Sequence, residues 1–103
     1  MRQFDVYTNP SERSREIIPF VLVLQSHLLS DLPTVVVAPM LLAEGRQTYT
    51  QISAVIRFQE RNYVVSVAEL AAIEVRVLGK VVGNLTDSED LVRRALDRLF
   101  TGF

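Results

Sequence analysis

The sequence predicts an α+β protein, mainly β, in which several antiparallel strands come first and one helix comes last. Most of the chain consists of short segments that alternate apolar and polar residues or that are rich in valine and leucine, and both patterns are typical of strands. Only the C-terminal segment has apolar residues at helical spacing. A run of strands followed by a helix favours a mostly antiparallel sheet.

The N-terminal quarter of the chain contains two predicted strands and the loop between them. Residues 3–8 (QFDVYT) alternate, which predicts a strand with Phe4 and Val6 on one face. Residues 9–16 (NPSERSRE) combine turn-forming residues with charges and predict an exposed loop. Residues 19–26 (PFVLVLQS) form a continuous apolar run of strand length, which predicts a buried strand.

The middle of the chain predicts a further strand and a hairpin. Thr34 begins a β-branched strand, which we expect Pro39 to end. Residues 41–49 (LLAEGRQTY) are expected to hold a helical turn before Gly45. Residues 51–58 (QISAVIRF) alternate and predict a strand, and residues 59–62 (QERN) predict a polar four-residue turn that leads into the returning strand.

The next segment continues the pattern of strands. The returning strand of the hairpin is expected over residues 63–67 (YVVSV), and residues 68–73 (AELAAI) are expected to form a single helical turn. Residues 74–85 are rich in valine and interrupted by Gly79 and Gly83, which predicts a strand that bends or bulges.

The C-terminal segment predicts an amphipathic helix. Thr86 and Glu89 match a capping box, with Thr86 as the N-cap. Acidic residues fill the first turn and arginines follow, an order that complements the helix dipole. The residues of the predicted core stripe are Leu91, Val92, Ala95, Leu96, Leu99 and Phe100.

The composition predicts one domain over residues 1–103. Hydrophobic residues make up 49% of the chain and charged residues 22%, which is the ordinary balance of a globular domain. The formal net charge of −1 provides no basic excess for binding nucleic acid. The chain has no cysteine, which excludes disulfides. There is neither a signal-peptide pattern nor a run of roughly 18 apolar residues, so we expect a cytoplasmic protein without membrane contact.

Residues that carry catalysis or bind metals are scarce. His27 is the single histidine, and Ser26 and Asp31 lie near it in sequence. A hydrolase triad is assembled across a fold and rarely from adjacent residues, so we interpret His27 as a surface loop residue. One histidine without cysteine does not make a metal site, and the four glycines form no phosphate-binding loop. The sequence therefore predicts no catalytic residue, metal or cofactor.

Two loops have both a structural and a binding interpretation. The segment from Glu12 to Glu16 (ERSRE) mixes both charges, so it is either a solvated turn or a docking surface. Leu28 and Leu29 follow a predicted strand within a polar loop. We expect one of these leucines to belong to the core and the other to be an exposed anchor for binding.

The chain ends in LFTGF, although termini are usually polar and frayed. One interpretation places Phe100 in the core stripe of the helix and folds Phe103 back onto the protein or a dimer partner, because apolar groups seek burial. In the other, Gly102 lets the backbone leave the helix, so that Phe103 becomes an aromatic anchor of the kind that dominates binding hot spots. Both hold if the helix buries its stripe and the last three residues face a partner.

The whole chain resembles the CcdB toxins of plasmid and chromosomal toxin–antitoxin modules. The start, QFDVYTN, is similar to that family's first strand. VLVLQSHLLSDLP is similar to its second strand and the following loop, with Leu28 and Leu29 as paired branched aliphatics. IEVRVLGKVVGNLTDSEDLVRRALDRLFTGF resembles the family's C-terminal third and is the most specific match, through the helix entry near Leu85 and the aromatic–X–Gly–hydrophobe ending.

The resemblance implies an SH3-like barrel with a C-terminal helix, a symmetric homodimer and no enzymatic activity. It also implies that the protein binds the A subunit of DNA gyrase and traps the cleaved DNA complex. A CcdA-like antitoxin would neutralise it through a disordered segment that folds on the toxin. By position, the antitoxin would contact Glu12, Arg13 and Arg15. The gyrase-binding residues that the resemblance implies are Leu28, Leu29, Asp97, Phe100, Thr101, Gly102 and Phe103.

Thr101 departs from the family pattern, in which a tryptophan precedes the final glycine. Loss of such an anchor typically costs more than about 2 kcal/mol of binding free energy. Asp97 also replaces a neutral amide, and Phe103 is larger than the usual isoleucine. Two alternatives to gyrase poisoning therefore stand. One is a CcdB-fold protein with weak or lost poisoning, and the other is a MazF-like endoribonuclease on a similar barrel, which the near-neutral charge and the lone His27 disfavour.

Overall fold

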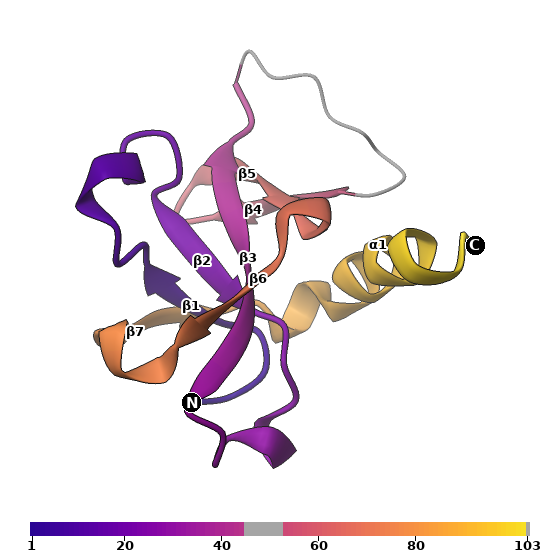
Figure 1. Ribbon diagram of the computed structural model, residues 1–103. Coiled ribbons are helices and arrows are strands. Elements are labelled where there is room, and N and C mark those ends of the chain that lie inside the picture. Colours follow the sequence, from indigo (N-terminus) through magenta and orange to yellow (C-terminus); the bar gives the residue numbers. More distant parts are fainter. Residues whose placement is uncertain (45–52, 103) are drawn as a thin grey trace.

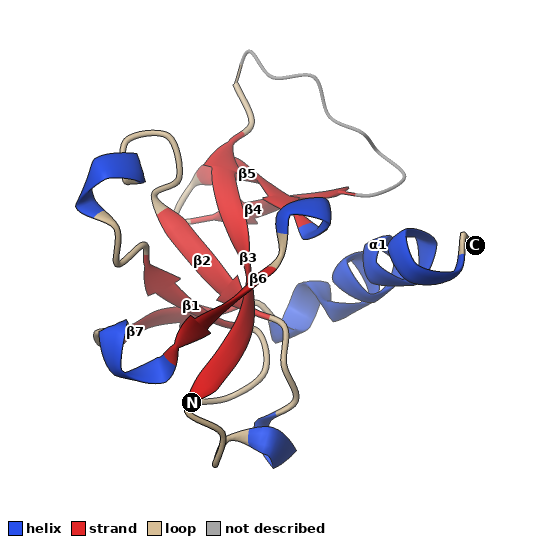
Figure 2. Ribbon diagram, viewed as in Figure 1, coloured by secondary structure: helices blue, strands red, loops and turns tan. Residues whose placement is uncertain are grey.

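The computed structural model describes residues 1–44 and 53–102, and the seven strands in this part of the chain form one curled antiparallel sheet (Figure 1). The strands follow the order β4-β5-β3-β2-β1-β7, and β6 pairs with β3 outside this path. Figure 2 shows short 3₁₀ turns between the strands and a longer helix at the C-terminal end. This confirms the predicted fold class, which is mainly β with a C-terminal helix. The elements are β1 (Asp5–Thr8), η1 (Glu12–Ser14), β2 (Phe20–Val23), η2 (His27–Leu29), β3 (Thr34–Leu42), β4 (Ser53–Phe58), β5 (Arg61–Ser66), η3 (Val67–Glu69), β6 (Ala71–Glu74), η4 (Val75–Val77), β7 (Val81–Asn84), η5 (Thr86–Ser88) and α1 (Glu89–Thr101).

The sheet buries apolar side chains on both faces. Leu22 of β2 belongs to the core cluster that α1 covers, whereas Val21 and Val23 belong to a second cluster on the opposite face. Ile73 of β6 and Val75 of η4 pack against this second cluster. Because β2 is buried on both faces, its sequence is a continuous apolar run and does not alternate.

The predicted core stripe of α1 is confirmed at its centre and wrong at both ends. Val92 and Ala95 are buried in the core cluster. Leu91 and Phe100 are 47% and 69% exposed. Phe100 is exposed because α1 projects beyond the sheet at its C-terminal end (Figure 1). The helix residues that are partly buried against the core are Leu96 and Leu99.

β3 runs through Pro39, so the strand end predicted at this proline is wrong. On one side β3 pairs with β2, and Pro39 lies opposite Val21. On the other side β3 pairs with β6 as far as Val37 and with β5 from Met40 onward. Pro39 therefore lies in the gap where β3 changes partner. A residue without a backbone N–H breaks no ladder hydrogen bond in this gap.

The helical turn predicted over residues 41–49 does not form in the described part of that range, because Leu41 and Leu42 end β3. Residues 45–49 lie outside the described residues. The β4–β5 hairpin is confirmed, but its turn has two residues and not four. These are Gln59 and Glu60, whose φ values of 50° and 66° are typical of two-residue hairpin turns.

Between β5 and the C-terminal helix, the chain forms more and shorter elements than predicted. The helical turn expected over residues 68–73 is the short η3, and β6 begins directly after Leu70. The valine-rich segment over residues 74–85 is not one bent strand, since η4 and the loop around Gly79 separate β6 from β7. β7 then pairs with β1, and the register shifts between Val6 and Tyr7.

The predicted capping box at Thr86 and Glu89 is wrong, because Asn84 supports the start of the helical segment. Asn84 Oδ1 accepts a hydrogen bond from Thr86 N at 2.8 Å, and the Thr86 hydroxyl also donates to this oxygen. Asn84 Nδ2 donates to Asp5 Oδ1 at 2.9 Å. One side chain thus links the helix entry to β1.

Candidate functional site

The C-terminal end of α1 presents an aromatic side chain to solvent, since Phe100 is largely exposed there. Thr101 Oγ1 donates to Asp97 O at 2.6 Å, which ties the last turn together. Gly102 N donates to Arg98 O at 3.0 Å, and Gly102 has a φ of 79°. This left-handed conformation favours glycine and ends the helix. The exposed residues of this tail surface are Asp97, Phe100, Thr101 and Gly102.

The described part of the tail decides only in part between the two interpretations of the C-terminal LFTGF segment. Phe100 does not complete the core stripe, so the interpretation that buries it is wrong. Phe103 lies outside the described residues, and its role as an anchor stays a prediction.

Leu28 and Leu29 are 84% and 52% exposed, so the prediction that one of them belongs to the core is wrong. They form η2, and Ser26 Oγ accepts a hydrogen bond from Leu28 N at 3.2 Å. Gln25 holds the turn against the sheet, because its side chain donates to Leu29 O and accepts from Val36 N, each at 3.2 Å. Polar contacts therefore hold the turn and leave both leucine side chains in solvent.

A depression lies at the loop that follows η2. This depression has a volume of about 590 Å³ and lies between the loop after η2 and the segment from β6 to η4. Leu32, which is exposed, and Val75 line it, and the ion pair of Glu74 and Arg76 lies at the same place. Exposed apolar groups gathered in this way are typical of a contact surface.

The charged loop after β1 is held in shape by Asn9, which is buried. The Asn9 side chain donates to Ser14 Oγ and Ile18 O at 2.9 Å and accepts from Ser11 N at 3.0 Å. Arg15 Nε donates to Asn9 O at 2.9 Å. The side chains that this loop exposes are Glu12, Arg13, Arg15, Glu16 and Ile17.

Sequence analysis misses two residues of this loop. Asn9 has the pattern of an ordinary turn residue, and only its burial shows that it anchors the loop. Ile17 belongs to no periodic pattern, yet it is exposed beside the charged side chains.

His27 is exposed, as predicted for a surface loop histidine. Within the described part of the chain, no hydrogen bond joins Ser26, His27 and Asp31 into a triad. Across the whole described part of the chain, no group of three or more histidine, aspartate or glutamate side chains could hold a metal ion.

The predicted binding residues that the structure describes form three separate surfaces. Figure 1 shows η1 at one side of the sheet, η2 at the bottom of the view and the C-terminal end of α1 at the far right. Leu28 and Leu29 therefore do not lie beside Phe100. The described part of the chain thus offers several separate contact surfaces.

The fold and these surfaces define a small β protein that acts through contacts with other macromolecules. Its exposed features are a shaped charged loop, a leucine pair and an aromatic helix end, and protein interfaces use all three kinds of group. The family model described as CcdB protein matches residues 3–102. The chain therefore belongs to the CcdB family, which confirms the resemblance. A comparison with curated proteins gives no match.

The family assigns a class of function. Its members are non-enzymatic toxins of type II toxin–antitoxin modules directed at DNA gyrase, and their partners are the A subunit of gyrase and the antitoxin CcdA. The prediction that the chain is not an enzyme is confirmed at this level. Among the helices of the described residues, none combines the length and apolar character needed to cross a membrane.

Proposed function

We propose that this protein is a homodimeric toxin that binds the A subunit of DNA gyrase, traps the enzyme's cleaved DNA complex, and is neutralised in the cytoplasm by a CcdA-like antitoxin. The family supports the two partners. The observation that carries the proposal for this chain is Phe100, a large aromatic side chain that is 69% exposed at the end of a rigid helix. Leaving such a group in solvent is unfavourable unless a partner covers it.

The tail surface is suited to act as a binding anchor because its base is fixed. Val92 and Ala95 seat α1 in the core, so the helix that carries Phe100 is anchored to the sheet. A preorganised side chain loses less conformational entropy on binding than a mobile one. Thr101 supplies far less area than the tryptophan of the family pattern, so Phe100 becomes the main aromatic anchor of the described tail.

The dimer is the part of the proposal that joins the separate surfaces. A twofold axis would place two tail surfaces and two leucine pairs in one symmetric arrangement. The surface would then be matched to a target that is itself symmetric. Sedimentation equilibrium measures this directly, and a protein that remains monomeric at micromolar concentration contradicts the dimer.

The loop that contains Glu12, Arg13 and Arg15 is the proposed antitoxin surface. Asn9 gives this loop a defined shape, and the exposed charges of both signs can pair with charges on a disordered segment that folds on binding. The Arg13→Glu variant should bind the antitoxin more weakly and leave gyrase poisoning unchanged. If it weakened both equally, the two surfaces would not be separate.

The test of the main proposal is DNA cleavage by purified gyrase from the source organism. The natural chain is compared with Phe100→Ala, with Thr101→Trp, and with Val82→Ala as a control that truncates an exposed side chain on β7. We expect linear, protein-linked DNA with the natural chain and with the control. Phe100→Ala should need roughly 30-fold more protein for the same cleavage, the effect of losing a hot-spot residue.

Each outcome decides between the hypotheses. If cleavage appears only with Thr101→Trp, the scaffold is that of a gyrase poison and this chain has weak or lost poisoning. If neither the natural chain nor Thr101→Trp causes cleavage, the gyrase proposal is wrong, and cleavage of RNA becomes the next assay. If Phe100→Ala and the natural chain cause the same gyrase cleavage at the same concentration, Phe100 is not the anchor.

A further inference from the structure

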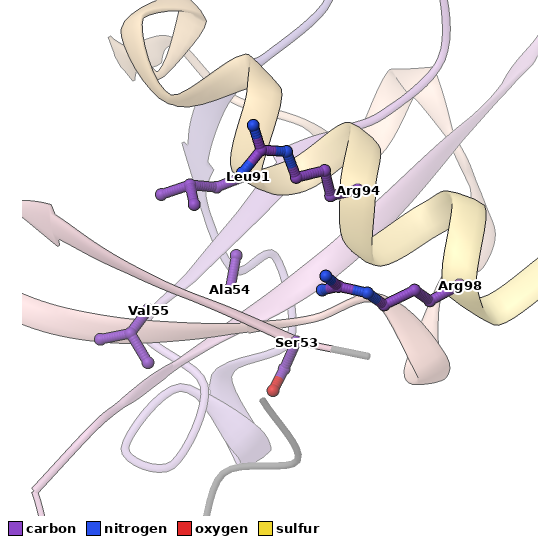
Figure 3. A pocket seen from close by; sticks show the side chains of 6 residues that line it. All are labelled: Ser53, Ala54, Val55, Leu91, Arg94 and Arg98. Atoms are coloured by element: carbon purple, nitrogen blue, oxygen red, sulfur yellow. The ribbon is translucent and has the colours of Figure 1, made fainter. Parts of the chain in front are cut away.

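A groove separates the edge strand β4 from the helix α1 (Figure 3). Its volume is about 200 Å³, which is below the range of roughly 300–1,000 Å³ that holds small-molecule ligands. A space of this size suits one or two side chains of a peptide. The residues that line the groove are Ser53, Ala54, Val55, Leu91, Arg94 and Arg98.

Two apolar side chains face solvent at this groove. Val55 of β4 is 46% exposed and Leu91 of α1 is 47% exposed. Ala54, by contrast, is buried in the core cluster. Along β4 the side chains alternate between the core and solvent, so Val55 lies on the outer face of the strand. The groove is thus bordered by apolar area that the fold itself leaves uncovered.

Arg94 and Arg98 supply positive charge at the groove and form no ion pair with another residue of the described chain. They lie one helical turn apart, and both side chains run back along α1 in the direction of Leu91 (Figure 3). Among the described residues, neither arginine takes part in an ion pair or hydrogen bond. Arg93 differs, because its Nε pairs with Glu89 at 3.0 Å.

The strand beside these arginines can accept another strand. Among the described strands, β4 pairs only with β5, so its other edge from Ala54 to Arg57 carries backbone groups without sheet partners, whereas Phe58 packs against Gly83 of β7. An extended peptide can add to such an edge through main-chain hydrogen bonds. Arg57 is exposed on the same strand and adds a third positive charge to this side of the molecule.

We propose that this groove binds an acidic, extended peptide segment. The peptide backbone pairs with the edge of β4, its carboxylates face Arg94 and Arg98, and its apolar side chains lie beside Val55. A nucleic acid fits less well, because the chain as a whole has a net charge of −1 and the groove is bordered by a strand edge and apolar groups.

Phe100 of the tail surface does not line this groove. At 100° per residue, Arg94 and Phe100 point about 120° apart around the helix axis. A peptide in the groove therefore leaves Phe100 free for its own partner. The groove goes beyond the proposed function, since it adds a fourth contact surface to the tail, the leucine pair and the charged loop.

The test uses the full chain and a fluorescein-labelled peptide of alternating valine and glutamate, measured by fluorescence anisotropy at low salt. A twin peptide carries glutamine in place of glutamate, and a second twin has N-methylated backbone amides. The protein variant is Arg94→Gln with Arg98→Gln, and Arg93→Gln is its matched control on the same helix. Circular dichroism verifies that both variants remain folded.

We expect the acidic peptide to bind the natural chain and the Arg93→Gln control equally. Binding to the double variant should be roughly fivefold to tenfold weaker, as expected for the loss of two exposed charge pairs. The N-methylated twin should not bind, because it cannot pair with the strand edge. Equal binding of the glutamine twin, or tighter binding of an oligothymidylate that competes with the peptide, would overturn the proposal.

Discussion

Phe58 of β4 lies directly against Gly83 of β7, although these strands are at opposite ends of the strand order. A Cβ atom at Gly83 would lie 2.4 Å from Phe58 Cε1 and 2.7 Å from Phe58 Cζ. Phe20 and Tyr63 surround the same ring in edge-to-face contacts, with centroid distances of 5.2 and 6.2 Å. The curled sheet is thus closed by side-chain packing, because among the described strands no ladder joins β4 to β7.

This contact predicts that Gly83→Ala destabilises the protein. The added methyl group would overlap the Phe58 ring, which its aromatic neighbours prevent from moving away. Overpacking of this kind typically costs about 1–3 kcal/mol. Urea unfolding followed by circular dichroism measures the free energy of unfolding.

The matched control for this prediction is Gly79→Ala. A Cβ at Gly79 would have no heavy atom within 4 Å, so this variant should be within about 0.5 kcal/mol of the natural chain. Gly83→Ala combined with Phe58→Leu should be less destabilised than the sum of the two single changes, because the smaller side chain makes room. Additive effects would show that the Phe58–Gly83 contact is not the cause.

Asn84→Ala should destabilise the protein by about 1–3 kcal/mol, because it removes the acceptor for Thr86 N and leaves buried Asp5 without one of its donors. Asn84→Asp separates the two effects. It keeps the acceptor for Thr86 but places a carboxylate beside Asp5. In urea unfolding, Asn84→Asp should have a lower free energy of unfolding than the natural chain at neutral pH. This difference should shrink in acid, where carboxylates are protonated. A loss that does not depend on pH would contradict this explanation.

The raised pKa of Tyr7 predicts that the protein loses stability in alkaline solution. Burial, assisted by the negative charge of Asp5, raises the pKa of Tyr7 above 10.0. The folded state therefore holds the phenolic proton more tightly than the unfolded state does. This contribution to the free energy of unfolding is fully present below pH 10.0, the ordinary pKa, and is lost as the pH rises through the raised folded pKa.

The measurement for Tyr7 is the free energy of unfolding as a function of pH, together with the ultraviolet absorbance of the phenolate. Tyr7→Phe removes the titrating hydroxyl and keeps the ring, so its stability should fall less steeply above pH 10.0. If both proteins lost stability in parallel, groups other than Tyr7 would be responsible.

Asn9→Ala should loosen the charged loop. It removes three side-chain hydrogen bonds, those with Ser11, Ser14 and Ile18, at a cost of about 1–3 kcal/mol for the buried groups left unpaired. Hydrogen exchange should accelerate at Ile18, whose backbone N–H donates to Ser14 O at 2.7 Å. Asn62→Ala, which truncates an exposed side chain on β5, is the control and should leave this exchange rate unchanged.

Much of the architecture could be predicted from local patterns. Alternation identified β1 and the β4–β5 hairpin, the continuous apolar run identified β2, and helical spacing identified α1 with its buried Val92 and Ala95. Each of these patterns reports which face of an element is apolar, and that information lies within a few consecutive residues. Likeness over the whole length supplied the family.

The errors at Pro39 and Asn84 have a different cause. Whether a proline interrupts a strand depends on whether a neighbouring strand needs its N–H, and β3 changes partner at Pro39. Which side chain supports the helix entry depends on what lies beside it in space, and Asn84 is held by Asp5 from the far end of the chain. No window of sequence contains either relationship.

The sequence by itself determined the succession of strands and helix, the antiparallel class and the membership of the family, because these follow from periodicity and likeness along the chain. Only the tertiary structure decided which apolar residues reach solvent. Phe100 and Leu91 have the pattern of core residues, and the sequence predicts that one of Leu28 and Leu29 is buried, but burial requires a neighbour. α1 extends past the sheet, η2 is held by polar contacts, and β4 is an edge strand with a groove beside Arg94 and Arg98. The surfaces available for binding are therefore the places where apolar side chains have no neighbouring element to pack against.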